Sequence, residues 1–363
     1  MVLRCNLCGC GAPQQPSVRV IFEFIALYLV GIYELIRQWF FSVPLSSDCN
    51  TVLQDVIRDQ KLVIVLSGVT SGIGRELLHS LLRTSADVIA LTHPSTTVKD
   101  PGCKQVMIDF ESIESTTAVI NKLLAELTSL PPRKAIYIHC AAVYNPLPLV
   151  SNGYSLTSVE RTLLTNTFIP AAFIEGIASV VSGVVYIGSS SQKAASRFDI
   201  RHCLLQAAQS PYGAYPVSKL LSLLHIADWG VRTGKPCIVI HPGIVATRLY
   251  HTQKGLIGAI LRGFVSQFAW NAETSATRIF KVLQRSRFFD MAMSGSRKNT
   301  VRITNEYYVY WDCVTMDVSA PPAQVPKSET STLAMHIHHI LMDSSLVCSK
   351  KPFFVETANL RAS

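Results

Sequence analysis

The sequence has little charge and no long block of one sign. Asp, Glu, Lys and Arg make up 16% of the 363 residues, and no run of five or more like charges occurs although the net charge is +9. Basic segments that bind nucleic acid usually form such blocks. The composition therefore argues against a nucleic-acid partner, and the scattered positive charge favours an anionic membrane surface or a phosphate-bearing ligand.

The sequence also lacks a paired cysteine pattern and an N-x-S/T sequon. Ten cysteines spread over this length do not form a disulfide framework. Cys5, Cys8 and Cys10 have no second pair at zinc-binding spacing, so no metal is predicted. Palmitoylation next to a membrane segment is the alternative that this cluster favours.

A clean apolar run of membrane-spanning length is missing as well. Residues 18–41 are largely apolar, but the uninterrupted core covers only residues 24–33, between Glu23 on one side and Glu34 and Arg37 on the other. A full span needs about 20 apolar residues. Burying the flanking charges in lipid would cost free energy.

Three interpretations of this segment compete. A signal peptide is disfavoured because no small-residue cleavage site follows. A signal anchor with snorkelling ends and an interfacial helix with the aromatic residues 39–41 at headgroup level both remain open. A helix packed on the next domain is the alternative without a membrane. We predict that residues 1–48 form a tail and a membrane anchor helix.

From residue 61 onward, short β-rich apolar runs alternate with helical periodicity. The expected strands are residues 61–66, 87–92, 104–108, 134–140, 183–188, 236–241 and 306–311, and the expected helices are residues 72–83, 113–127, 156–180 and 212–231. This alternation predicts an α/β fold, a Rossmann-like doubly wound parallel sheet with helices on both faces. We assign it residues 55–312, followed by a C-terminal extension, residues 313–363.

Three glycines follow the first predicted strand and open the first predicted helix. Gly68, Gly72 and Gly74 have the spacing G-x-x-x-G-x-G. Glycine lets the backbone approach a pyrophosphate, and a helix N-terminus offers free N–H groups to it. Thr70 and Ser71 can add hydroxyl contacts. The position of the loop in a βαβ series predicts a dinucleotide site.

The end of the second strand indicates which dinucleotide binds. NAD sites usually carry an acid there to hold the ribose hydroxyls, but this strand ends in residues 90–93 without one. His93 or Arg75 could accommodate a 2′-phosphate. The sequence therefore favours NADP(H) over NAD(H) as cofactor.

Tyr215 and Lys219 are spaced i and i+4, so they share one face of a helix. A tyrosine with a pKa near 10 is a poor acid or base at neutral pH. A nearby ammonium stabilises the phenolate and lowers that pKa. The lysine can also reach the ribose of a cofactor. The pair by itself is common in sequences, and a solvated helix face is the alternative.

Three further polar residues follow predicted elements in an order that suits hydride chemistry. Ser189 follows a strand end and could polarise a substrate carbonyl. Asn166 lies within a predicted helix and could hold a water that relays protons to the lysine. Thr247 follows the last core strand and could bond a carboxamide.

Taken together, these motifs resemble the short-chain dehydrogenase/reductase family. The matching segments are residues 67–74, Asp109, residues 139–142, Asn166, Ser189, residues 215–219 and residues 242–247. The resemblance implies that Tyr215 is the general acid/base, that Ser189 and Lys219 assist it, and that Asn166 completes a tetrad. The implied cofactor contacts are Ser67, Gly68, Thr70, Ser71, Gly72, Ile73, Gly74, Asp109 at the adenine, Ala141, Tyr215, Lys219 and Thr247.

A finer likeness is to membrane-associated, retinol-dehydrogenase-like members. It rests on residues 152–166, the insert 192–211, and residues 270–276. It implies a hydrophobic alcohol, aldehyde or ketone as substrate, of polyprenol or dolichol type, and attachment to the endoplasmic reticulum membrane. A homodimer is left open.

The sequence departs from the family pattern at three places. Ser67 replaces the usual Thr, H-C-A-A at residues 139–142 replaces N-N-A-G, and Gly188 stands where a Ser is common. Ser189 and Ser190 therefore compete for the catalytic position, and alignment of the strand favours Ser189. These departures motivate the alternative of a catalytically silent, membrane-tethered dinucleotide-binding scaffold or sensor.

Overall fold

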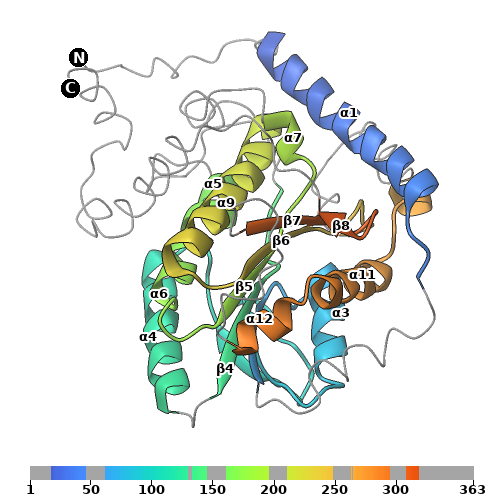
Figure 1. The fold of residues 1–363 in the computed structure, drawn as a ribbon. Helices are drawn as coiled ribbons and strands as arrows, with labels where there is room; N and C mark the ends of the chain where they lie inside the picture. The colour runs from blue at the N-terminus through green and yellow to red at the C-terminus, as the bar shows by residue number, and fades with distance from the viewer. Residues whose placement is uncertain are drawn as a thin grey trace, which may run out of the picture.

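The structure is a computed structural model (Figure 1). It describes residues 18–45, 62–129, 133–144, 161–195, 211–247, 263, 265–294 and 308–318. The cysteine cluster at Cys5, Cys8 and Cys10 and most of the predicted C-terminal extension lie outside these ranges.

An eight-stranded sheet forms the centre of the molecule, in the order β3-β2-β1-β4-β5-β6-β7-β8. The strands are β1 (Leu62–Ser67), β2 (Asp87–Thr92), β3 (Lys104–Met107), β4 (Lys134–His139), β5 (Gly183–Ile187), β6 (Cys237–His241), β7 (Tyr308–Asp312) and β8 (Asp317–Val318). All neighbours are parallel except β7 and β8. The predicted doubly wound sheet is confirmed, and it continues through β8, past residue 312.

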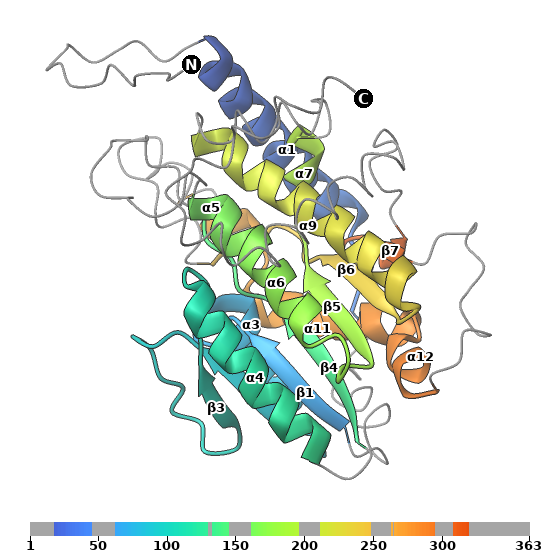
Figure 2. The same cartoon turned by 90° about the vertical axis from the view of Figure 1, so that its left-hand side faces the viewer.

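Helices cover both faces of the sheet. They are α1 (Val18–Phe41), α3 (Gly72–Leu81), α4 (Ile113–Ser129), α5 (Arg161–Leu163), η1 (Leu164–Phe168), α6 (Ile169–Gly176), α7 (Gln192–Ala195), α9 (Pro211–Thr233), α11 (Ala272–Arg285) and α12 (Phe288–Ser294). Figure 2 shows α4, α6 and α9 in front of the sheet and α3, α11 and α12 behind it.

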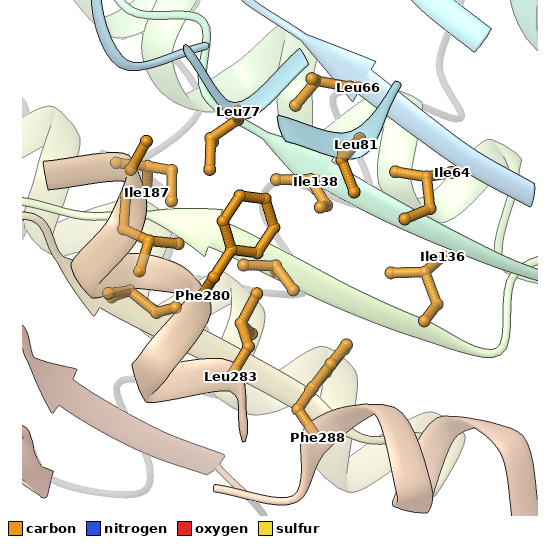
Figure 3. Close-up of a cluster of buried hydrophobic side chains, with 14 of the residues drawn as sticks. Ile64, Leu66, Leu77, Leu81, Ile136, Ile138, Ile187, Phe280, Leu283 and Phe288 are labelled. Atoms are coloured by element: carbon orange, nitrogen blue, oxygen red, sulfur yellow. The ribbon is translucent and has the colours of Figure 1, made fainter. Parts of the chain in front are cut away.

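The central strand β1 is buried on both sides, as parallel sheets require. Ile64 and Leu66 point into a cluster with α3 and α11 (Figure 3), whereas Val63 and Val65 point into a second cluster under α4 and α6. Burying each such side chain contributes roughly 1.5–3 kcal/mol relative to exposure. This two-sided core fixes the strand ends, and with them the loops that follow.

The predicted helix 156–180 is interrupted, and it ends at Gly176 in the structure. A π-helical turn, η1, separates α5 from α6, while residues 156–160 lie outside the described ranges. The Asn166 carbonyl accepts hydrogen bonds from the Tyr186 hydroxyl (2.7 Å) and Ser222 Oγ (3.0 Å). The Asn166 carbonyl thus has two hydrogen-bond partners that do not belong to the backbone hydrogen bonds of the helix. Such single-turn π segments occur frequently at functional sites.

Helix α1 packs on α9 and α7 with its polar side inward. Glu34 and Gln38 are buried, whereas Leu29, Trp39 and Phe40 are more than half exposed. In the described part of the chain, no helix has both the length and the apolar character needed to cross a membrane. The charges that break the apolar run in the sequence thus face the protein.

Candidate active site

A cavity of about 350 Å³ opens at the carboxyl ends of the parallel strands. This location is where doubly wound sheets bind ligands. Its volume lies at the lower end of the range for small-molecule sites. Its lining includes the predicted site residues Gly68, Thr70, Ser71, Gly72, Ile73, Gly74, Asp109, Ala141, Ser189, Tyr215, Lys219 and Thr247. The fold therefore brings together residues that are up to 179 positions apart, from Gly68 to Thr247.

The loop after β1 forms a close-packed cradle that only glycine allows. Gly68 and Gly72 have φ angles of +75° and +55°. A Cβ on Gly74 would lie 2.2 Å from the Gly68 carbonyl oxygen, and one on Gly68 would lie 2.7 Å from the Ala141 nitrogen. Helix α3 begins in this loop, and the Ser71 side chain makes no cap hydrogen bond to it. Its first-turn N–H groups and positive dipole end suit an anion.

Ser67 lies behind the cavity wall and supports it, rather than lining it. Its hydroxyl oxygen accepts hydrogen bonds from the backbone N–H groups of Cys140 (3.1 Å) and Ala141 (3.3 Å). Ser67 itself is fully buried. It therefore joins the end of β1 to the end of β4 and positions Ala141, which does line the cavity.

His139, the first residue of the altered H-C-A-A segment, is packed as a neutral ring. Burial and the Lys219 charge lower the pKa of His139 to about 3. Its Nδ1 lies 2.7 Å from the Tyr137 hydroxyl, and its ring stacks on Tyr186 with centroids 4.9 Å apart. The ring thus lies behind the rest of the segment, residues 140–142, which line the cavity.

Tyr215 and Lys219 lie one turn apart on α9, and both line the cavity. The Lys219 Nζ is 5.8 Å from the centre of the Tyr215 ring and donates to the Ile187 carbonyl at 3.1 Å. Burial lowers the pKa of Lys219 to about 8. At neutral pH the ammonium is still the main form, so a positive charge lies beside the phenol and favours its ionisation.

The two competing serines have different positions. Ser189 lines the cavity, and its Oγ accepts a hydrogen bond from the Ser191 backbone at 3.2 Å. Ser190 is buried outside the lining, and its backbone N–H donates to His241 Nδ1 at 3.2 Å. The geometry therefore supports Ser189 as the serine that can reach a ligand.

Asn166 acts on the cavity through the backbone. Its Oδ1 accepts from the Val143 N–H, and its Nδ2 donates to the Val143 carbonyl, both at 2.8 Å. The same Nδ2 donates to Ser218 Oγ at 3.1 Å. Val143 lines the cavity and Asn166 does not. The side chain thus positions the loop after β4, and the water relay stays a prediction.

The residues predicted to lie near the adenosine part of the cofactor also differ in whether they line the cavity. His93 and Asp109 line the cavity, with His93 Nε2 3.8 Å from an Asp109 carboxylate oxygen. The Arg75 guanidinium instead contacts the neighbouring Glu76 at 3.2 Å. Of the two residues predicted to accept a 2′-phosphate, His93 is the one at the cavity.

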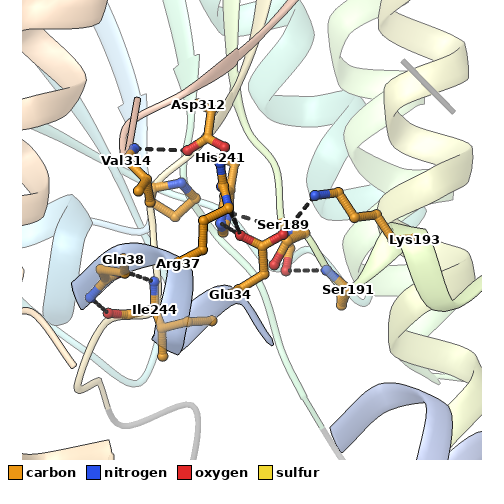
Figure 4. Close-up of polar contacts among 12 residues, drawn as sticks. Glu34, Arg37, Gln38, Ser189, Ser191, Lys193, His241, Ile244, Asp312 and Val314 are labelled. Atoms are coloured by element: carbon orange, nitrogen blue, oxygen red, sulfur yellow. Dashed lines mark hydrogen bonds and ion pairs between the residues drawn. The ribbon is translucent and has the colours of Figure 1, made fainter. Parts of the chain in front are cut away.

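The segment of residues 242–247, which the sequence analysis singled out, lines the cavity after β6 with residues 242–245 and Thr247. Sequence reasoning missed the contribution of α1, whose Glu34 and Gln38 contact the segments behind the cavity (Figure 4). The available signal was the pair of polar residues Glu34 and Gln38, at i and i+4 in a largely apolar helix. The sequence alone did not show which way that pair faces.

No family model matches the chain, and the search of curated proteins finds no match. Solved structures share its fold at low identity. The NADPH-bound carbonyl reductase from chicken fatty liver is 15% identical, and the match covers 72% of this chain and 99% of that chain with a TM-score of 0.50.

Two other solved structures overlap to a similar extent. The aldohexose dehydrogenase of Thermoplasma acidophilum is 16% identical over 76% of this chain and 99% of its own, with a TM-score of 0.47. A Pseudomonas syringae protein described as a short-chain dehydrogenase is 12% identical over 72% and 97%, with a TM-score of 0.49. At 15% identity, the likeness to the chicken reductase establishes the fold.

Proposed function

We propose that this protein is an NAD(P)-dependent oxidoreductase that interconverts a hydrophobic alcohol and its aldehyde or ketone. The observation that carries the proposal is that Tyr215, Lys219 and Ser189 line the same cavity as the glycine cradle of residues 68–74. A proton-transfer group, its electrostatic support and a hydroxyl donor thus lie beside a site built for a phosphate-bearing ligand.

The cavity fits a nicotinamide dinucleotide. The glycine loop and the uncapped start of α3 suit the pyrophosphate, and Asp109 and His93, which line the same cavity, would contact the adenosine half. The absence of an acid at the end of β2, with His93 there instead, favours NADP(H) over NAD(H). When bound, such a cofactor supplies or accepts the hydride.

The residues of the chain carry the proton part of the reaction. In carbonyl reduction the Tyr215 hydroxyl gives its proton to the carbonyl oxygen, and in alcohol oxidation the phenolate takes it back. The Ser189 hydroxyl donates a hydrogen bond to the same oxygen. The Lys219 ammonium lowers the free energy of the phenolate in both directions. General acid/base catalysis of this kind contributes about 10²–10⁴-fold.

We further propose that α1 attaches the protein to a membrane by lying in the interface. The support is the arrangement of the helix, which buries Glu34 and Gln38 against the domain and exposes its large apolar side chains. The exposed set is Ile21, Phe22, Ile25, Leu29, Ile32, Tyr33, Ile36, Trp39, Phe40 and Phe41. Interfacial helices insert such a face into the headgroup and acyl boundary, and the net charge of +9 suits anionic lipid.

The substrate class and location follow from the same features. An enzyme whose anchor helix lies in the membrane interface has access to substrates dissolved in lipid, and the resemblance to retinol-dehydrogenase-like enzymes implies a retinoid, polyprenol or dolichol-type alcohol at the endoplasmic reticulum. We propose these as the first substrates to test.

The proposal is tested by NADPH and NADH oxidation at 340 nm with retinal, steroid ketones, sphingoid ketones and polyprenals. We expect turnover with at least one of them. Tyr215→Phe should lower kcat by about three orders of magnitude while NADPH still binds, as followed by its fluorescence. Full activity of this variant would refute the assignment. Cofactor binding without turnover of any carbonyl would favour the silent scaffold.

Membrane attachment is tested by co-sedimentation with vesicles that contain anionic lipid. The double variant Leu29→Glu, Ile32→Glu should stay in the supernatant, because it places two charges on the face that would enter lipid. Val231→Glu on α9 is the control, since it alters an equally exposed apolar residue on another helix. Equal sedimentation of all three proteins would contradict the interfacial role of α1.

A further inference from the structure

The Gln38 side chain makes a two-point contact with the backbone of a residue 206 positions away. Its Oε1 accepts from the Ile244 N–H at 2.7 Å, and its Nε2 donates to the Ile244 carbonyl at 3.1 Å (Figure 4). Gln38 is only 2% exposed. The side-chain amide thus pairs with both backbone groups of this residue, as a residue on a neighbouring strand would.

Ile244 belongs to the loop of residues 242–247, which lines the cavity after β6. The Trp270 N–H also donates to the Ile244 carbonyl, at 3.0 Å. Gly243 has φ +83°, and a Cβ there would lie 2.5 Å from the Trp270 ring and 2.7 Å from Gln38 Oε1. The loop is therefore held between Trp270 and Gln38, with no room for a side chain at Gly243.

A buried charge cluster fixes the turn of α1 that carries Gln38. The Glu34 carboxylate is fully buried and accepts hydrogen bonds from Lys193 Nζ (2.6 Å) and Arg37 Nε (2.8 Å). Arg37 also pairs with Asp312 at the end of β7. Lys193 lies in α7, which begins three residues after Ser189. Charged groups that are paired and hydrogen-bonded in this way hold a defined geometry.

We propose that Gln38 is a positioning residue for the cofactor site. It holds the Ile244 peptide, and through it the loop that forms the wall of the cavity next to Thr247, in the conformation that binds the dinucleotide. This inference rests on the proposed function for the identity of the ligand. A loop that is already held in its binding conformation needs no ordering when the ligand binds. Losing the Gln38 contact therefore weakens the affinity for the dinucleotide.

The test compares Gln38→Met with Gln105→Met in the full-length protein. Gln105 is a matched control because its amide makes the same two hydrogen bonds, to the Val98 N–H (3.1 Å) and carbonyl (2.6 Å), outside the cavity lining. The primary measurement is the NADPH dissociation constant from fluorescence titration. Losing one hydrogen-bonded pair of this kind corresponds to about tenfold in affinity.

We expect Gln38→Met to raise the NADPH dissociation constant about tenfold, with a larger effect on KM for NADPH than on kcat. Gln105→Met should bind NADPH as the unmodified protein does. A folded Gln38→Met protein with unchanged NADPH affinity would overturn the proposal while leaving the proposed function intact. An unmodified protein that binds neither NADPH nor NADH would overturn both.

Hydrogen exchange gives a readout that needs no variant and no ligand. The Ile244 amide should be protected in the cofactor-free protein, because Gln38 Oε1 is its acceptor. Exchange of that amide at the rate of an unprotected loop would contradict the contact, even if Gln38→Met does not fold.

Discussion

The two halves of the cavity are supported in different ways. The nucleotide half, which comprises residues 68–74, His93 and Asp109, lies directly after the neighbouring strands β1, β2 and β3. The reaction half, which comprises Ser189, Tyr215, Lys219 and residues 242–245, is assembled from distant segments and held by buried polar contacts from α1, η1 and α9.

Close packing thus holds the nucleotide half in place, whereas side-chain hydrogen bonds hold the reaction half. The glycine cradle is fixed by close backbone packing, because a Cβ on Gly68 or Gly74 would overlap neighbouring backbone atoms. The reaction half depends on single side chains such as Asn166 and Gln38, each satisfying a backbone N–H and carbonyl. We therefore expect changes at Ser189 or Tyr215 to affect turnover, loss of the Gln38 contact to weaken cofactor binding through the loop of residues 242–247, and changes in the nucleotide half to affect both cofactor affinity and folding.

After Tyr215→Phe, the largest effect on kcat is expected for Ser189→Ala, which should lower kcat about 10²-fold without changing the NADPH dissociation constant. The reason is the loss of one hydrogen-bond donor to the reacting oxygen. Ser190→Ala is the matched control, because Ser190 is buried outside the cavity lining and contributes its backbone N–H to His241. A greater loss of kcat in Ser190→Ala than in Ser189→Ala would show that the catalytic role belongs to Ser190 and not to Ser189.

Lys219 should make the stability of the protein rise with pH. Burial lowers its pKa from the ordinary lysine value of 10.5 to about 8 in the folded protein, so the unfolded state binds more protons between these two pH values. The stabilisation is complete above pH 10.5 and is lost as the pH falls through about 8. The shift corresponds to roughly 3 kcal/mol.

The measurement is the free energy of unfolding in urea from pH 7 to 10.5, for the unmodified protein minus Lys219→Met. The difference should increase with pH across this window, because other alkaline titrations are common to both proteins. A difference that is flat or falls with pH would contradict the burial of the ammonium.

Gly74→Ala should destabilise the nucleotide half by about 1–3 kcal/mol and weaken NADPH binding. The added Cβ would lie 2.2 Å from the Gly68 carbonyl oxygen, so the backbone of the cradle must shift. Gly31→Ala on α1 has nothing within 4 Å of its Cβ and serves as the control for thermal unfolding and for binding. If Gly74→Ala binds NADPH normally, the cradle does not hold the pyrophosphate.

The smallest effect is expected for His93→Asp, which should raise the dissociation constant for NADPH about tenfold while that for NADH changes little. A carboxylate at the end of β2 repels a 2′-phosphate and can bond the ribose hydroxyls of NAD. Parallel fluorescence titrations with both cofactors measure the ratio. An unchanged ratio of the two dissociation constants would show that His93 does not lie beside the 2′ position of the bound cofactor.

The sequence predicted the sheet and most of the nucleotide half because both depend on local patterns. Strand periodicity, the spacing of Gly68, Gly72 and Gly74, and the Tyr215–Lys219 turn are all short-range signals. The π-helical turn at Asn166 was missed because Tyr186 and Ser222, which bond its carbonyl, are distant in sequence.

The contribution of α1 was out of reach of pattern analysis for a related reason. Hydropathy treats Glu34 and Arg37 as interruptions of an apolar run. Their partners Lys193 and Asp312 lie 159 and 275 positions further along the chain. Only the tertiary arrangement shows that these charges face the protein and that the apolar side of the helix faces outward.

Deuterium transfer tests the central claim most directly. The unmodified protein is given NADPH carrying deuterium at C4 of the nicotinamide together with a hydrophobic carbonyl, and the alcohol product is analysed by mass spectrometry. We expect one deuterium on the carbinol carbon with the unmodified protein and no labelled alcohol with Tyr215→Phe. With both C4 hydrogens replaced by deuterium, an unlabelled alcohol product, in a protein that binds NADPH, would contradict hydride transfer in this cavity.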